Sequence, residues 1–130
     1  MYTLSPSLIK ALQGLLSSDS LKALSRHASA IHEKYTGGGL DKKLSQEEAL
    51  AYCFFRMPST YAAVCYLSSR IEEKGISFSP TSLLDIGCGP GTAYFAMKER
   101  YPLLQEALCI DHNEHFLSLF RQLSQAVGQP

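Results

Sequence analysis

Three glycines and an aspartate in the second half of the chain have the residue types and spacing of a ligand-binding turn. Gly87, Gly89 and Gly91 directly follow the apolar run 82–86, and Asp111 ends a second apolar run. Glycines let the backbone adopt dihedral angles that are closed to other residues and come close to a ligand. A helix that follows such a turn points its free N–H groups and the positive end of its dipole at the same place. The pattern therefore predicts a site for a nucleotide-like ligand.

The residues around this turn distinguish between such ligands. A dinucleotide fingerprint needs a further glycine at position 92, which is Thr92, and the turn lacks the Gly-Lys-Ser/Thr of a phosphate-binding loop. Asp85, just before the turn, would repel a phosphate but suits a ligand with an ammonium group. An acid at the end of the next strand, here Asp111, typically accepts the hydroxyls of an adenosine ribose. An ammonium and a ribose together indicate S-adenosyl-L-methionine as the cofactor.

These residues lie in a predicted strand–helix–strand–helix unit. Apolar periodicity predicts strands over 82–86 and 106–111 and helices over 91–101 and 114–127. Alternation of this kind is typical of parallel strands joined by right-handed crossovers. We therefore expect an α/β fold in which residues 79–130 form the first βαβα half of a Rossmann-like domain.

A predicted helical segment over residues 1–78 precedes this unit. The predicted helices cover 5–17, 19–36, a stretch from residue 46 to a boundary at Met57, and 59–74. Ser45 and Glu48 have the spacing of a capping box, in which each side chain bonds the backbone N–H of the other residue. Pro58 predicts the boundary, because the residue before a proline avoids helical dihedral angles.

The stretch LLDIGCGPGT over 83–92, followed further along by CIDHNEHF, resembles the first two motifs of class I S-adenosylmethionine-dependent methyltransferases. The resemblance implies that the three glycines wrap the methionine part of the cofactor and that Asp85 helps to hold its amino group. It implies further that Asp111 holds the ribose and that His112 or Asn113 borders the adenine. The cofactor-binding residues that it implies are Asp85, Gly87, Cys88, Gly89, Gly91, Thr92, Asp111 and His112.

A longer stretch, LSQEEALAYCFFRMPSTYAAVCYLSSRI over 44–71, is similar to the methyltransferase-like family associated with the mitochondrial small ribosomal subunit and to its bacterial relatives. The shared pattern is Ala-Tyr, here Ala51-Tyr52, and then Arg-x-Pro-[Ala/Ser]-Thr-Tyr-Ala-Ala, here from Arg56 on. This similarity implies a methyltransferase that acts on ribosomal RNA of the small subunit. The alternative that it implies is a non-catalytic assembly or interaction module of that subunit, which keeps the cofactor-binding fold. The expected partner is ribosomal RNA or the small ribosomal subunit.

The sequence departs from these families in two ways. Some members of the ribosome-associated family carry cysteines that hold an iron–sulfur cluster, and no matching cysteines are present in this sequence. The region that carries catalysis in class I methyltransferases, after the fourth strand, has no counterpart, so no catalytic residue is assigned.

Two strands also make a marginal sheet with an exposed edge. We therefore expect either that the remaining strands lie outside this sequence or that the chain self-associates through that edge.

Arg56 and Tyr61 each have two interpretations. Arg56 could contact the carboxylate of the cofactor or an RNA phosphate through its planar fork, or it could bond carbonyl groups that are freed at Pro58. Tyr61, like Tyr52, could line the cofactor site, whereas such aromatic residues are more often part of a core. From the sequence alone, both alternatives stay open for each residue.

Composition and charge argue against several functional classes. Lys plus Arg and Asp plus Glu each number 12, so the strongly basic composition of many nucleic-acid-binding domains is absent. The four cysteines form no Cys-x-x-Cys pair, which disfavours a metal or cluster site. No apolar run approaches the roughly 18 residues that a membrane span needs. The expected location is the cytoplasm of a bacterial-type cell, with the mitochondrial matrix as the alternative.

Overall fold

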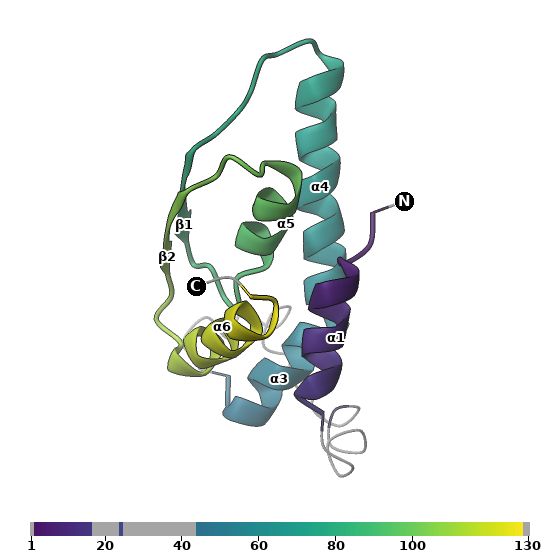
Figure 1. Cartoon of the computed structure of the whole chain (residues 1–130). Helices are drawn as coiled ribbons and strands as arrows, with labels where there is room; N and C mark the ends of the chain where they lie inside the picture. The colour runs from purple at the N-terminus through teal and green to yellow at the C-terminus, as the bar shows by residue number, and fades with distance from the viewer. Residues whose placement is uncertain (1, 17–23, 25–43, 129–130) are drawn as a thin grey trace, which may run out of the picture.

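The computed structural model of this protein describes residues 2–16, 24 and 44–128. The predicted helix over 19–36 therefore lies, except for one residue, outside the described residues. In chain order the elements are α1 (Pro6–Gly14), α3 (Gln46–Phe55), α4 (Met57–Glu73), β1 (Ser82–Ile86), α5 (Thr92–Arg100), β2 (Glu106–Ile110) and α6 (Glu114–Ala126). Helices followed by a βαβα unit with two parallel strands confirm the predicted α/β class and are consistent with a partial Rossmann-like fold (Figure 1). Within these described ranges, no helix has the length and the apolar character to cross a membrane.

Local capping determines where α3 begins. The Ser45 hydroxyl accepts from the Glu48 N–H at 3.2 Å, and a Glu48 carboxylate oxygen accepts from the Ser45 N–H at 3.2 Å. Both bonds of the predicted capping box are therefore present. They satisfy two backbone N–H groups at the helix start that would otherwise depend on water.

The break between α3 and α4 lies at Arg56, one residue before the predicted boundary at Met57. Helix α3 ends at Phe55, Arg56 lies between the two helices with a φ angle of −114°, and α4 begins at Met57. The second helix thus begins two residues earlier than the predicted start at residue 59. The reason is that proline lacks a backbone N–H, and the first turn of a helix does not use that group.

Strands β1 and β2 form a parallel pair with one covered face and one bare face. Their register aligns Leu84 with Leu108 and Ile86 with Ile110. Side chains of alternate residues point to opposite faces of a sheet, and these four are between 47% and 76% exposed. Helices α4 and α5 lie together on one side of the strands (Figure 1). The sheet therefore presents an apolar face that none of the described elements covers.

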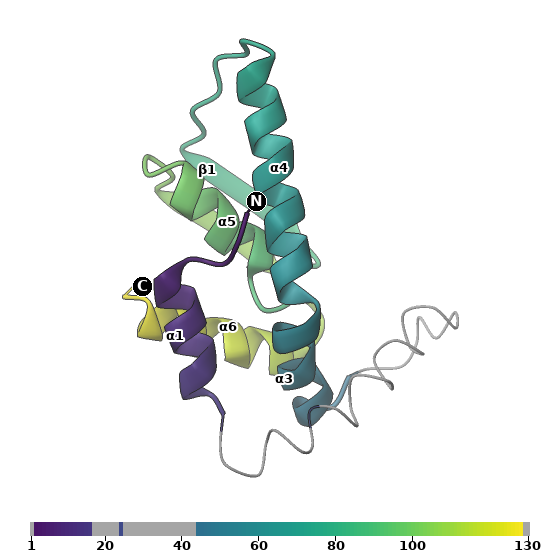
Figure 2. The ribbon, with the colours of Figure 1, turned by 90° about the vertical axis from the view of Figure 1, so that its right-hand side faces the viewer.

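One hydrophobic core joins the helical segment to the βαβα unit. Buried side chains from α1, α3 and α4 belong to the same cluster as buried side chains from α5 and α6. Helix α1 lies alongside α6, as Figure 2 shows. Leu8 of α1, Met57 of α4 and Leu123 of α6 are among the largest fully buried side chains. The predicted domain boundary between residues 78 and 79 stays a prediction, and the core packing crosses it.

We predict that the chain self-associates through its sheet, because among the described residues nothing covers the strand edge or the apolar face. Light scattering over a range of concentrations should then give a mass above that of one chain. The variant Leu108→Lys, which places a charge on the bare face, should lower that mass towards one chain. Leu67→Lys is the matched control, because Leu67 of α4 is 62% exposed and Leu108 is 61% exposed. A single-chain mass for the unchanged protein would contradict the prediction.

Candidate functional site

The turn that follows β1 is hydrogen-bonded to residues at the end of β2. This turn covers residues 87–91, and we call it the glycine loop. The Ile110 carbonyl accepts from the backbone N–H groups of the first two loop residues, at 2.7 and 2.9 Å. The next loop residue, Gly89, donates its N–H to Asp111 Oδ2 at 2.8 Å. Three successive loop amides are therefore bonded to two successive residues at the end of β2, which fixes the path of the loop.

All three glycines of the loop have left-handed backbone angles, and the surroundings of Gly89 and Gly91 differ. Gly89 has a φ angle of +56°, and a Cβ atom placed on it would lie in open space. Gly91 has a φ angle of +91°, and a Cβ atom there would lie 2.8 Å from the ring of Phe120 in α6. Gly89 therefore leaves room beside the loop, as a ligand cradle needs. Gly91 leaves room for α6 to pack against the start of α5.

Both carboxylate oxygens of Asp111 accept hydrogen bonds. Oδ2 accepts from the Gly89 N–H, and Oδ1 accepts from the Asn113 N–H at 2.8 Å. The side chain of Asp111 is only 8% exposed. Each carboxylate oxygen has a second lone pair. Asp111 can therefore hold the loop and still accept a hydroxyl group from a ligand.

Asp85 has a buried carboxylate oxygen without a partner. Its Oδ2 makes no hydrogen bond within the part of the chain that the structure describes. Burial raises the pKa of Asp85, and the charge of the Asp111 carboxylate raises it further. Thr92 Oγ1, at the first residue of α5, is also buried and lacks a partner among the described residues. Buried polar atoms of this kind are costly, so a ligand that supplies the missing partners would lower the cost.

These features fit the predicted cofactor. The open space at Gly89 suits close contact with a ligand, and the unpartnered oxygen of Asp85 suits an ammonium group. Asp111 adds a second acid within electrostatic reach of the first. Two acidic acceptors beside an open loop suit an amino acid joined to a nucleoside, and binding of S-adenosylmethionine stays a prediction.

Cys88 is a neutral, buried residue of the glycine loop. It is 6% exposed, and its thiol donates a weak hydrogen bond to the Gly89 carbonyl at 3.5 Å. Burial, followed by the effect of Cys109 and the two aspartates, raises the pKa of Cys88 to about 12. The thiol is therefore protonated near neutral pH, which leaves little thiolate that could act as a nucleophile. Over residues 2–16, 24 and 44–128, no cluster of three or more His, Cys, Asp or Glu side chains could hold a metal ion.

The remaining predicted site residues lie in different places. His112 is 79% exposed, and its Nδ1 lies 3.7 Å from Asp111 Oδ1, so it borders the site acid. Arg56 is exposed at the junction of α3 and α4. Tyr61 is 2% exposed, and burial raises its pKa to about 12, so its side chain belongs to the core. The structure thus brings His112 to the glycine loop, and the roles of all three residues stay predictions.

Tyr52 links the helical segment to the site. Its ring packs edge-on against Phe116 of α6, with 5.1 Å between the centroids. Burial raises the pKa of Tyr52, a hydrogen bond with Thr60 and the charge of Arg56 lower it, and the charge of Asp111 contributes a further rise. The phenol is therefore within electrostatic reach of both the helix junction and the site acid. Helical spacing alone does not reveal this position, because it depends on how α3 packs against α6.

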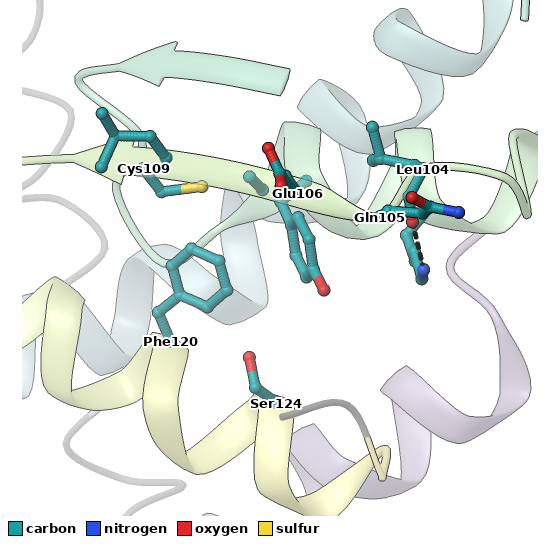
Figure 3. A pocket seen from close by; sticks show the side chains of 10 residues that line it. Leu104, Gln105, Glu106, Cys109, Phe120 and Ser124 are labelled. Carbon is teal, nitrogen blue, oxygen red and sulfur yellow. Dashed lines mark hydrogen bonds between the residues drawn. The ribbon is translucent and has the colours of Figure 1, made fainter. Parts of the chain in front are cut away.

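A separate cavity lies along β2. It has a volume of about 560 Å³ and is bounded by β2, α5 and α6. Figure 3 shows Phe120 and Ser124 of α6 on one side of it and Cys109 and Glu106 of β2 on the other. No predicted cofactor-binding residue lines this cavity. It is therefore distinct from the predicted cofactor site.

We predict that Gly91→Ala destabilises the protein more than a glycine replacement that causes strain alone. A left-handed alanine costs about 1–2 kcal/mol, and the contact with Phe120 adds about 1–3 kcal/mol of overpacking. Gly75→Ala is the control, because Gly75 has a φ angle of +72° and open space around it. Urea unfolding measures both variants. Equal losses in the free energy of unfolding would contradict the proposed contact between the loop and α6.

Comparison with known proteins adds to this geometry. A search of curated proteins finds no match to the chain. A protein-family model described as mitochondrial small ribosomal subunit Rsm22 matches residues 46–129. The matched region contains α3, α4, the glycine loop and Asp111, and it covers more than half of the chain. This match confirms the family similarity indicated by the stretch 44–71, and the chain belongs to the Rsm22 family.

Proposed function

We propose that the chain binds S-adenosylmethionine at the glycine loop and serves in methyl transfer to RNA of the small ribosomal subunit. The description of the Rsm22 family supports association with that subunit. The observation that carries the cofactor part is the hydrogen bond of 2.8 Å between the Gly89 N–H and Asp111 Oδ2. It holds an open glycine loop next to one acid, within electrostatic reach of the unpartnered Asp85.

Each residue has a proposed role that suits its chemistry. Asp85 would accept from the amino group of the cofactor, and Asp111 would accept from the ribose hydroxyls. His112, at the exposed rim, would border the adenine. Thr92 would offer its buried hydroxyl, while Cys88 would fill the turn as a small neutral residue. When bound, the cofactor supplies an electrophilic methyl group, and the contribution of these residues is to hold and orient it.

RNA recognition would depend on a small number of side chains. The 12 basic and 12 acidic residues of the chain balance, so a broad basic surface does not support it. Arg56 is exposed at the junction of α3 and α4, and we propose it as the contact to an RNA phosphate. Tyr61 is 2% exposed and would support this junction from within the core.

The alternative function is a non-catalytic assembly module of the small ribosomal subunit. The balanced charge favours it, because a module that binds ribosomal proteins needs no basic surface. For either function the proposed location is the cytoplasm, and the mitochondrial matrix is the alternative that the family description supports.

Calorimetry with S-adenosylmethionine, followed by transfer of a labelled methyl group to small ribosomal subunits, separates these functions. Micromolar binding together with transfer supports the methyltransferase. Binding without transfer, combined with co-sedimentation of the chain with the subunit, supports the assembly module. A folded chain that does not bind the cofactor refutes the cofactor site.

We predict that Asp85→Asn weakens cofactor binding and stabilises the free protein. Loss of a charge-assisted hydrogen bond should lower the affinity about 10- to 100-fold. The folded-state pKa of Asp85 is raised, so its contribution to stability is present below the unfolded pKa and is lost as the pH rises through the folded pKa. Above the unfolded pKa the burial of Asp85 therefore costs stability, and a neutral side chain removes this cost. Calorimetry and urea unfolding measure the two opposite effects.

The pH dependence provides a second readout. Cofactor affinity of the unchanged protein should increase as the pH rises through the raised pKa of Asp85, because an ammonium group binds the ionised carboxylate. Asp85→Asn should remove this dependence. Glu106→Gln is the control, because Glu106 is an exposed acid on the neighbouring strand. An affinity of the Asp85→Asn variant equal to that of the unchanged protein would exclude the proposed role.

A further inference from the structure

Asn113, the residue that caps α6, has both polar atoms of its side chain in hydrogen bonds. It is a buried residue, only 5% exposed. Its Oδ1 accepts from the backbone N–H groups of His115 at 2.9 Å and Phe116 at 3.2 Å, which caps the helix. Its Nδ2 donates to the Leu44 carbonyl at 3.2 Å. The side chain therefore has two local partners and one partner 69 residues away in the sequence.

Leu44 lies just before α3. It immediately precedes Ser45, the cap of that helix, and is 6% exposed. The bond from Asn113 therefore ties the start of α3 to the turn that follows β2. The edge-on contact between Tyr52 of α3 and Phe116 of α6 braces the same two helices. Two independent contacts thus fix the start of α6 relative to α3.

Asn113 also reaches the glycine loop through its backbone. Its N–H donates to Asp111 Oδ1 at 2.8 Å, and Asp111 Oδ2 accepts from the Gly89 N–H at 2.8 Å. A continuous path of hydrogen bonds therefore runs from the start of α3, through Asn113 and Asp111, to the glycine loop. A shift of α3 would act on the loop along this path.

We propose that Asn113 is a positioning residue that couples the placement of the helical segment to the shape of the glycine loop. Capping alone does not require asparagine, because aspartate and serine cap helices equally well. Neither of them has an N–H donor for the Leu44 carbonyl, whereas asparagine has both an acceptor and donors. A partner that displaces α3 therefore changes the loop. The effect on cofactor affinity rests on the function proposed above, and the coupling itself does not.

Residue-resolved hydrogen exchange of the free chain tests the coupling without any cofactor. Asn113→Asp keeps an oxygen for the cap of α6 and places a second oxygen against the Leu44 carbonyl. The Gly89 amide should then exchange about tenfold faster, while the amides of His115 and Phe116 keep their protection. Unchanged exchange at Gly89 would overturn the proposal.

A second pair of variants leaves Asn113 in place. Ser45→Ala removes the cap of α3 and should also accelerate exchange at Gly89, although the two residues are far apart in the sequence. Ser5→Ala is the matched control, because Ser5 caps α1 by accepting from the Leu8 N–H at 3.3 Å, outside the path. It should leave Gly89 unchanged. Equal acceleration in both variants, or in neither, would overturn the coupling.

Calorimetry with S-adenosylmethionine tests whether the coupling changes the affinity for the cofactor. Asn113→Asp should lower the affinity, and cofactor binding to the unchanged protein should slow exchange of the Glu48 amide at the start of α3. If the unchanged protein does not bind the cofactor, the proposed function fails, and the exchange data on the free chain still decide the coupling. If Gly89 exchanges faster but the affinity stays the same, the link from the loop to the cofactor is refuted.

Discussion

The hydrogen bond from the Gly89 N–H to the Asp111 carboxylate joins the two parts of the candidate site. Three of the five residues of the glycine loop have no side chain, and backbone bonds to the end of β2 fix the path of the loop. Strands β1 and β2 are parallel and in register, with Ile86 opposite Ile110. The carboxyl ends of parallel strands meet at one edge of a sheet. The loop that follows one strand therefore meets the acid that follows the other, and a slip of one residue in the pairing would separate them.

The described helices cover only one face of the two strands that carry the glycine loop and Asp111 (Figure 1). The core runs from α1, α3 and α4 into α5 and α6, so the βαβα unit does not have a core of its own within the described residues. Two connections from this core reach the site directly. Phe120 of α6 packs where Gly91 lacks a side chain, and Asn113 bonds the start of α3. The glycine loop is thus positioned by the helical segment as well as by the strands, which gives a physical basis for communication between a partner on the helices and a ligand on the loop.

Features that depend on neighbouring residues could be predicted from the sequence. The capping box of Ser45 and Glu48 and the apolar strand that leads into the glycine loop each require information from a few adjacent positions, and both are present. The break between α3 and α4 lies one residue before its predicted place at Met57. Features that depend on tertiary packing could not be predicted. The Asn113–Leu44 bond spans 69 residues, and the steric need for glycine at position 91 arises from a ring in another helix. The acidic character of Asp111 predicted a ligand contact, but nothing in its sequence context indicated that it also holds the loop.

The protonated thiol of Cys88 has a consequence for the chemical durability of the site. Peroxides and electrophiles attack cysteine mainly as the thiolate. With a pKa raised to about 12 and a side chain only 6% exposed, Cys88 offers almost no thiolate for such a reaction near neutral pH. Burial in the loop therefore lowers the reactivity of a cysteine that lies between two glycines of the turn.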